Sequence, residues 1–235
     1  MESINIVFLP YAGGSSYSYL QYIYGLGENI SIYSIDYAGH GKRFREKPKK
    51  SFEELVEDVI VQFDKIPKKN LVIFGHSMGA LVAAYVSEWL YKKAPGCIKK
   101  IILSCCVTPD KVRTKMNKCI SDEELLDYLC YERKIPKETI FSVQFQKYYW
   151  KIIKNDFEIM REFDNRPLFL PECPLYCILA DEDKDIGYKD VEEWKNYTNE
   201  IVKLYTVKGN HFYFEEEPHK FTELLKNIVT QNMTA

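Results

Sequence analysis

The chain has 235 residues, of which 46% are hydrophobic and 28% are charged, and its formal net charge is -2. This length fits one α/β domain with a sizeable core, and the apolar content excludes a disordered chain. The nearly neutral balance of charge argues against a nucleic-acid-binding surface. No apolar run reaches the roughly 20 residues that a membrane span requires. We therefore expect a single domain over residues 1–235 that binds neither nucleic acid nor membrane.

The N-terminus and the cysteines both indicate a cytoplasmic protein. Residues 1–5 contain no basic region and no small-residue cleavage site, so we expect no signal peptide. The seven cysteines are odd in number and show no C-x-x-C spacing, which favours reduced thiols. The four histidines do not pair with the cysteines at the spacing of metal ligands, so we expect no metal site.

Short apolar runs alternate with helical patterns along the chain. Strands are predicted at residues 4–9, 30–35, 71–74, 100–105, 175–180 and 202–207, and helices at 17–26, 51–66, 78–92, 188–198 and 215–229. Several of the strands are apolar at consecutive positions, as strands buried on both faces are. The alternation predicts an α/β fold with a mostly parallel central sheet flanked by helices.

Residues 109–170 interrupt this alternation. The segment has no convincing strand, and helices are predicted over 122–133 and 137–163. A stripe of aromatic and aliphatic residues runs from Tyr148 to Met160. Individually these residues are expected to pack against the core. As a block, the segment is expected to form a helical lid over the active site.

The sequence Gly-His-Ser-Met-Gly at 75–79 directly follows the apolar run at 71–74. A strand that ends in G-x-S-x-G and turns at once into a helix is typical of the nucleophile elbow of the α/β-hydrolase fold. The two glycines are expected because a Cβ at either position would collide with the neighbouring strand and helix. Ser77 is then the candidate nucleophile, and the backbone N–H of Met78 can donate to an oxyanion.

A serine nucleophile needs a histidine base, and the histidine needs a carboxylate partner. In this fold the three residues follow the chain order Ser, Asp or Glu, His. His211 follows strand 202–207 through a glycine turn, so we expect it to be the base. The acid should follow strand 175–180, where several carboxylates are adjacent. We favour Asp183 for its position in this turn, with Asp181 as the second choice and Asp185 as the third.

The other three histidines receive other roles. His40 lies in a glycine-rich turn after the second strand, where we expect a structural role. His76 precedes the candidate nucleophile and is expected to pack below the elbow. His219 lies in the final helix and is expected to face solvent.

The loop after the first strand is expected to supply the second oxyanion donor. It reads Pro-Tyr-Ala-Gly-Gly-Ser over 10–15, and its two glycines allow backbone N–H groups to face a ligand. We assign the donor to the N–H of Ala12, with Tyr11 as the alternative. The loop lacks both common phosphate-binding glycine patterns.

Four segments in order resemble the type II thioesterases, the stand-alone editing hydrolases of nonribosomal peptide and polyketide synthesis. They are residues 10–15, 37–43, 75–80 and 209–212. Residues 154–158 look like the lid sequence of that family, and Trp194 falls where the family has a tryptophan after the catalytic aspartate. The likeness covers nearly the whole chain. The chain departs from the family pattern at Asn210 and Ala180, where glycine is usual.

The resemblance implies hydrolysis of acyl thioesters carried on the 4′-phosphopantetheine arm of acyl or peptidyl carrier proteins. It implies Ser77, His211 and Asp183 as the triad, with Ala12 and Met78 as oxyanion donors, and no cofactor of the enzyme's own. We also expect a monomer. The alternatives are a carboxylesterase or lipase acting on small oxygen esters, a medium-chain acyl thioesterase of fatty-acid synthesis, and a non-catalytic binding protein of this fold.

Overall fold

Six parallel strands form one central sheet in the computed structural model, which describes residues 3–23, 25–116 and 121–231. The strand order is β2-β1-β3-β4-β5-β6. The strands are β1 (Ile4–Leu9), β2 (Ile30–Ser34), β3 (Leu71–His76), β4 (Ile98–Ser104), β5 (Leu175–Ala180) and β6 (Val202–Val207). The parallel sheet predicted from the alternating pattern is confirmed.

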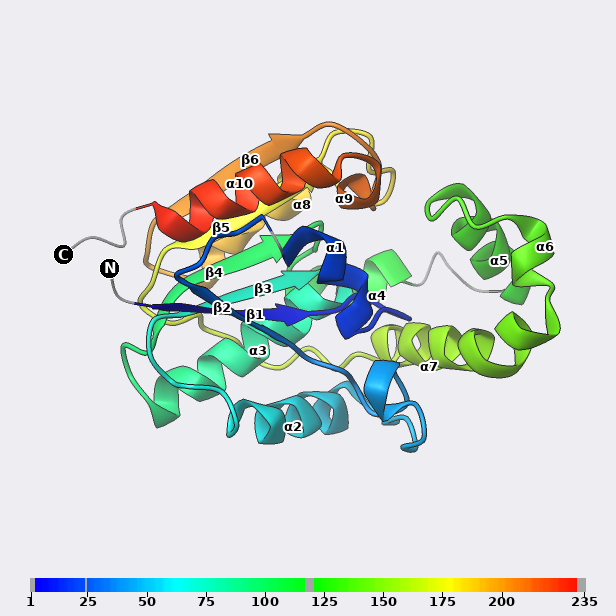
Figure 1. The fold of residues 1–235 in the computed structure, drawn as a ribbon, viewed down its shortest axis with the longest axis horizontal. Coiled ribbons are helices and arrows are strands. Elements are labelled where there is room, and N and C mark those ends of the chain that lie inside the picture. Colours follow the sequence, from blue (N-terminus) through cyan, green and yellow to red (C-terminus); the bar gives the residue numbers. More distant parts are fainter. Residues whose placement is uncertain (1–2, 24, 117–120, 232–235) are drawn as a thin grey trace.

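Helices cover both faces of this sheet. The α-helices are α1 (Leu20–Ile23), α2 (Phe52–Phe63), α3 (Met78–Lys93), α4 (Pro109–Met116), α5 (Asp122–Tyr131), α6 (Lys137–Ile140), α7 (Trp150–Arg161), α8 (Tyr188–Glu192), α9 (Tyr213–Glu216) and α10 (Pro218–Thr230). Helices α2 and α3 pack on each other below the sheet in Figure 1, and α1 packs on α10 on the opposite side. Short 3-10 helices span Ser16–Tyr19, Gly41–Arg43 and Glu193–Tyr197.

Burial follows the position of each strand in the sheet. Every residue of β1, β3 and β5 is buried, whereas β2 and β6 at the two edges are only partly buried. An inner parallel strand is covered by helices on both faces, which explains its continuous apolar sequence. All six strands end at the same edge, so the loops that follow them meet there.

Several predicted helices are shorter or interrupted in the structure. The helix predicted at 215–229 is divided into α9 and α10, because a residue before proline disfavours helical geometry and Glu217 precedes Pro218. The helix predicted at 188–198 changes from α8 to a 3-10 helix at Glu193. The helix predicted at 17–26 begins as a 3-10 helix capped by Ser15, and residue 24 within it lies outside the described residues.

The helical insertion lies between β4 and β5. Figure 1 shows α5 and α6 beyond the carboxyl ends of the strands, with α7 leading back to the sheet. The continuous helix predicted over 137–163 is divided into α6, a π-helix over Phe145–Tyr149, and α7. Five buried apolar residues form a small separate core: Leu125, Leu129, Ile140, Phe145 and Ile153. Residues 117–120 of the insertion lie outside the described residues.

Among the described residues, none of the helices has the length and apolar character needed to cross a membrane.

Candidate active site

Ser77 lies at a sharp turn between β3 and α3. Its φ is +54°, a left-handed backbone conformation that a residue with a side chain rarely adopts. Each of the two flanking glycines lies so close to neighbouring backbone atoms that a side chain would not fit. A Cβ on Gly75 would lie 2.1 Å from the carbonyl oxygen of Gly79, and one on Gly79 would lie 2.2 Å from that of Leu9. The strained serine and the two close approaches form the geometry of a nucleophile elbow.

His211 and Asp183 form a buried hydrogen-bonded pair. The Nδ1 of His211 lies 2.7 Å from Oδ2 of Asp183, and the two side chains are 6% and 1% exposed. The other carboxylate oxygen of Asp183 accepts backbone N–H groups from Asp185 and Ile186. The carboxylate is therefore fixed on both sides and holds the imidazole in one orientation.

The Nε2 of His211 is buried and has no hydrogen-bond partner among the described residues. Ser77 and His211 line the same cavity. Catalytic hydrogen bonds are often long in an enzyme without substrate. The unbonded Nε2 is therefore compatible with a role of His211 as a general base.

The two other candidate acids have different surroundings. Asp181 is exposed, and its Oδ1 accepts the backbone N–H of Gly209, which fixes the loop that carries His211. Asp185 is also exposed, and its backbone carbonyl accepts a hydrogen bond from Lys115. Of the three carboxylates, only that of Asp183 bonds to the imidazole.

Asn210 occupies a position where the family usually has glycine, and its backbone does not require glycine. Gly209 has a φ of +124°, whereas Asn210 is not among the residues with positive φ. The side-chain oxygen of Asn210 accepts the N–H of Phe212, and its amide donates to the backbone carbonyl of Glu132. Asn210 therefore ties the histidine loop to the end of α5.

His76 packs below the elbow, as expected. It is fully buried, its ring centroid lies 4.8 Å from that of His211, and its Nδ1 lies 3.0 Å from the hydroxyl of Ser104. Burial, with a further contribution from the nearby His211 and Arg133, holds the pKa of His76 well below its usual value. His219 is exposed on α10.

The loop after β1 turns beside the elbow. The N–H of Gly14 donates to the carbonyl of Tyr11 at 2.8 Å, so Ala12 and Gly13 occupy the centre of a turn. Gly13 has a φ of +72°, which favours glycine. Ala12 lines the cavity together with Met78. The ring of Tyr11 packs in the core against Tyr19 and Phe212 instead.

Asp156 of α7 holds this loop in place. Its Oδ2 accepts the N–H of Gly13 at 2.7 Å and lies 2.8 Å from Nε2 of His40. The other nitrogen of His40 lies 3.2 Å from the carbonyl of Ala38. Only an imidazolium can donate from both nitrogens. Burial opposes this charge, but Asp156 outweighs it and raises the pKa of His40. Sequence reasoning gave Asp156 no individual role, because its partners are distant in the chain.

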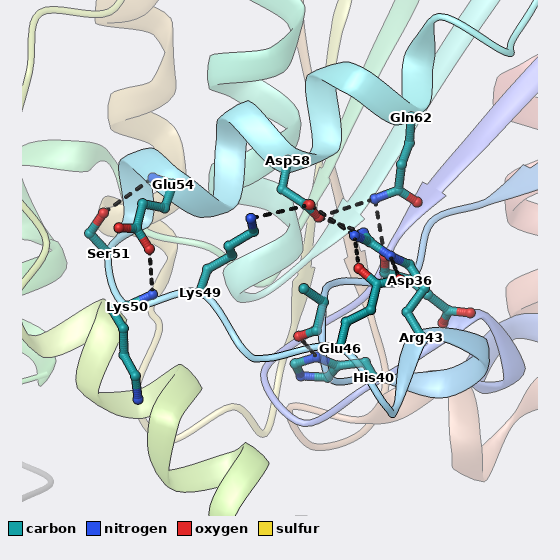
Figure 2. Close-up of polar contacts among 11 residues, drawn as sticks. Asp36, His40, Arg43, Glu46, Lys49, Lys50, Ser51, Glu54, Asp58 and Gln62 are labelled. Carbon is teal, nitrogen blue, oxygen red and sulfur yellow. Dashed lines mark hydrogen bonds and ion pairs between the residues drawn. The ribbon is translucent and has the colours of Figure 1, made fainter.

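The loop after β2 is also fixed to α2, as Figure 2 shows. Arg43 donates from both terminal nitrogens to the carboxylate of Asp58, at 2.5 and 2.9 Å. Gly41 has a φ of +47°, and a Cβ there would lie 2.2 Å from Oδ1 of the buried Asp36. These contacts hold His40 where it can reach α7.

The loops at the carboxyl edge and the insertion enclose a cavity of about 740 Å³. Ser77, Met78, Ala12 and His211 are among the residues that line it. Much of the remaining wall is apolar, with Val107, Val112, Met116, Phe157, Met160 and Ile186. The rim includes the charged residues Lys115, Glu124, Asp127, Glu132, Lys184 and Asp185.

Cys105 lies beside the pair of Asp183 and His211. One ligand atom from each of the three residues lies within 4.8 Å of the others, the only such group among the residues that the structure describes. Cys105 has a φ of +45° and is fully buried. Burial, reinforced by the charge of Asp183, holds the pKa of its thiol well above the usual value, which disfavours the thiolate form that binds metals. The sequence placed no cysteine near a histidine, because this contact depends on two separate strand ends.

The model of the thioesterase domain family matches residues 5–231. The chain belongs to this family. The expected thioesterase family is thereby confirmed, and the parallel sheet flanked by helices confirms the expected fold class.

The chain is similar to several known thioesterases over most of its own length and most of theirs. It is 26% identical to the probable anguibactin biosynthesis thioesterase AngT of Vibrio anguillarum, covering 98% of this chain and 93% of the relative. It is also 26% identical to the human medium-chain S-acyl fatty acid synthase thioesterase, covering 97% and 86%. The structure of RedJ, a prodiginine-pathway thioesterase of Streptomyces coelicolor, superposes with a TM-score of 0.85 at 23% identity, covering 96% and 90%. At that identity the likeness shows the fold.

Proposed function

We propose that this thioesterase removes aberrant or stalled acyl groups from the phosphopantetheine arm of carrier proteins in nonribosomal peptide or polyketide synthesis. The observation that carries the proposal is the buried bond between Asp183 and His211, in a cavity that both His211 and Ser77 line. Thioester hydrolysis is the reaction of the family, and AngT is a relative named for such biosynthesis. The assignment of the partner and of the individual residues is our proposal.

Ser77, His211 and Asp183 act as the triad in this proposal. His211 takes the proton of Ser77 through Nε2 as the hydroxyl attacks the thioester carbonyl. Asp183 orients the imidazole and stabilises the imidazolium that forms. The thiol of the arm leaves with the proton from His211. Water activated by the same histidine then hydrolyses the acyl-enzyme and frees the acid.

The N–H groups of Ala12 and Met78 stabilise the tetrahedral oxyanion. Both residues line the cavity with Ser77, and Met78 is the first residue of α3, where the helix dipole favours negative charge. The N–H of Gly13 is already bonded to Asp156, and Ala12 lines the cavity whereas Tyr11 is not among its lining residues, which favours Ala12 as the donor from this loop.

The helices α4 to α7 form a lid over the cavity in this proposal. The apolar wall of the cavity suits an acyl chain, and a carrier domain would present its arm from the outside. The arm belongs to the partner, so the enzyme's own residues supply the chemistry without a cofactor. We propose that the enzyme works as a cytoplasmic monomer.

The test is to incubate the enzyme with a carrier protein loaded with an acetyl or aminoacyl group and to follow loss of the group by mass spectrometry. We expect turnover by the wild type and a loss of at least about a thousandfold in Ser77→Ala. Ser87→Ala is the matched control, because Ser87 is a buried serine of α3 and is not among the residues that line the cavity.

Two results would overturn the proposal. Full activity of Ser77→Ala would exclude the serine mechanism. Rapid cleavage of simple oxygen esters without turnover of loaded carriers would identify a carboxylesterase instead. Cleavage confined to medium-chain fatty acyl carriers would indicate fatty-acid synthesis.

A further inference from the structure

Glu132 is a buried carboxyl at the cavity that the proposed mechanism does not use. It follows the last residue of α5, is only 5% exposed, and lines the cavity that contains Ser77 and His211. Its Oε2 is buried and has no hydrogen-bond partner among the described residues. A buried carboxylate oxygen without a partner is costly, so such an atom in a ligand cavity points to a missing donor from a ligand.

The basic side chains nearest to Glu132 in the chain, and Lys184, make contacts with other residues. Arg133 binds Glu215 at 2.8 Å and stacks over the rings of Tyr11 and Phe212. Lys134 is paired with Glu216. Lys184 lies over the ring of Tyr131 at 3.4 Å. No ion pair of Glu132 is formed among the residues that the structure describes.

The backbone of Glu132 fixes the position of its side chain. The N–H of Glu132 donates to the carbonyl of Tyr128, and its carbonyl accepts the side-chain amide of Asn210. The residue is thus held between α5 and the loop that carries His211. Burial raises the pKa of the Glu132 carboxyl, the nearby His211 opposes this, and Asp183 adds to it. A positively charged group of a ligand would offset the cost of burying the Glu132 carboxylate.

The charge around the cavity favours the same kind of ligand. Four carboxylic residues line it, Glu124, Asp127, Glu132 and Asp185, against the two lysines Lys115 and Lys184. Lys115 is itself bonded to Asp190 at 2.8 Å, outside the lining. The cavity therefore attracts positive charge, while its apolar wall suits a hydrocarbon side chain.

We infer that Glu132 is a specificity residue that binds the free amino group of an aminoacyl thioester. This inference rests on the proposed function, and it narrows the acyl group to an amino acid with an apolar side chain. In an aminoacyl thioester the ammonium is attached one carbon from the carbonyl that Ser77 attacks. His211 connects the two positions, because it interacts with Glu132 and lines the cavity together with Ser77.

The test compares two thioesters of N-acetylcysteamine that differ only in the amine, the leucyl and the 4-methylpentanoyl compounds. Each rate is divided by its uncatalysed rate, because the amine also activates the thioester. We expect the wild type to have at least about a tenfold higher corrected kcat/KM for the leucyl compound, the range expected of a charged hydrogen bond. Glu132→Gln should lose this preference, because the rate on the leucyl compound should fall more than the rate on the 4-methylpentanoyl compound.

Two further variants separate specificity from a structural role. Glu123→Gln makes the same change at an exposed position of α5 outside the cavity and should keep the preference. Glu132→Asp keeps the charge and should restore part of it. An equal loss on both compounds in Glu132→Gln would overturn the inference, since it would indicate a role through His211 or the fold.

The wild type alone also tests the inference, whatever the stability of the variants. Hydrolysis of the 4-methylpentanoyl compound without any preference for the leucyl compound contradicts the inference and leaves the proposed function intact. If the enzyme hydrolyses neither compound and also fails to hydrolyse a loaded carrier protein, the proposed function itself is contradicted.

Discussion

At the residue scale, the acid turn after β5 shows how identical side chains acquire different roles. Asp181, Asp183 and Asp185 are separated by single residues. Asp183 is held by two backbone N–H groups and reaches His211, whereas Asp181 binds the backbone of Gly209. Both contacts with the histidine loop span 28 positions in the chain.

This difference predicts opposite results for two equivalent substitutions. Asp183→Asn should lower kcat by about ten-thousandfold, because an amide does not stabilise the imidazolium and favours the wrong tautomer. Asp181→Asn should lower it only a few-fold, since the amide oxygen can still accept the N–H of Gly209. Steady-state kinetics on one acyl thioester measures both. Equal losses in the two variants would contradict the assignment of the acid.

At the scale of elements, a buried carboxylate joins the insertion to two loops at the carboxyl edge of the sheet. Asp156 of α7 bonds to both the loop after β1 and the loop after β2. Arg43 holds the second of these loops on α2, where Asp58 is its partner. The proposed lid and the proposed oxyanion loop are therefore positioned by one carboxylate.

The pair of His40 and Asp156 predicts a pH-dependent contribution to stability. The pKa of His40 is raised in the fold, so its contribution is complete below the unfolded pKa of about 6.5 and is lost as pH rises through the folded value. His40→Gln should destabilise the protein by about 1–3 kcal/mol at pH 6 and by less at pH 9. Urea unfolding of both proteins at the two pH values measures the difference.

His219→Gln is the control for this measurement, because His219 is exposed on α10. Its destabilisation should be near zero at both pH values. A cost of His40→Gln that grows from pH 6 to pH 9 would show that the neutral histidine, not the imidazolium, is the form that stabilises the fold.

At the scale of the whole molecule, a buried lysine connects the middle of the sheet with the C-terminal helix. Lys100 of β4 is 3% exposed, and its Nζ donates to the carbonyls of Ile228 and Val229 at 2.6 and 2.9 Å, and to that of Gln231. These carbonyls lie at the end of α10, where a helix leaves its acceptors without partners.

Lys100→Met should therefore destabilise the whole domain. It keeps the apolar stem but leaves buried carbonyls without a donor, at a cost of about 2 kcal/mol. For a protein of this size the melting temperature should fall by about 4–8 °C. Lys99→Met, at the adjacent exposed position of the same strand, should change it little. Thermal unfolding followed by circular dichroism compares the two, and equal melting temperatures would contradict the role of Lys100.

The amino-acid pattern is enough to predict the order of strands and helices along the chain, the elbow at Ser77 and the family. These features depend on local patterns: apolar strands buried on both faces, glycines where backbones approach, and a serine between them. The ends of the helices were less predictable, because a proline or a cap decides them within one or two residues.

Only the tertiary structure decided which side chains meet at the carboxyl edge. The bond of Asp183 to His211, the bond of Asp156 to His40 across 116 positions, and the burial of Glu132 depend on how separate loops converge. A charged side chain has the same local pattern whether it faces water or a buried partner. Its role therefore depends on how deeply the side chain is buried and on how close its partners lie, and the local sequence specifies neither.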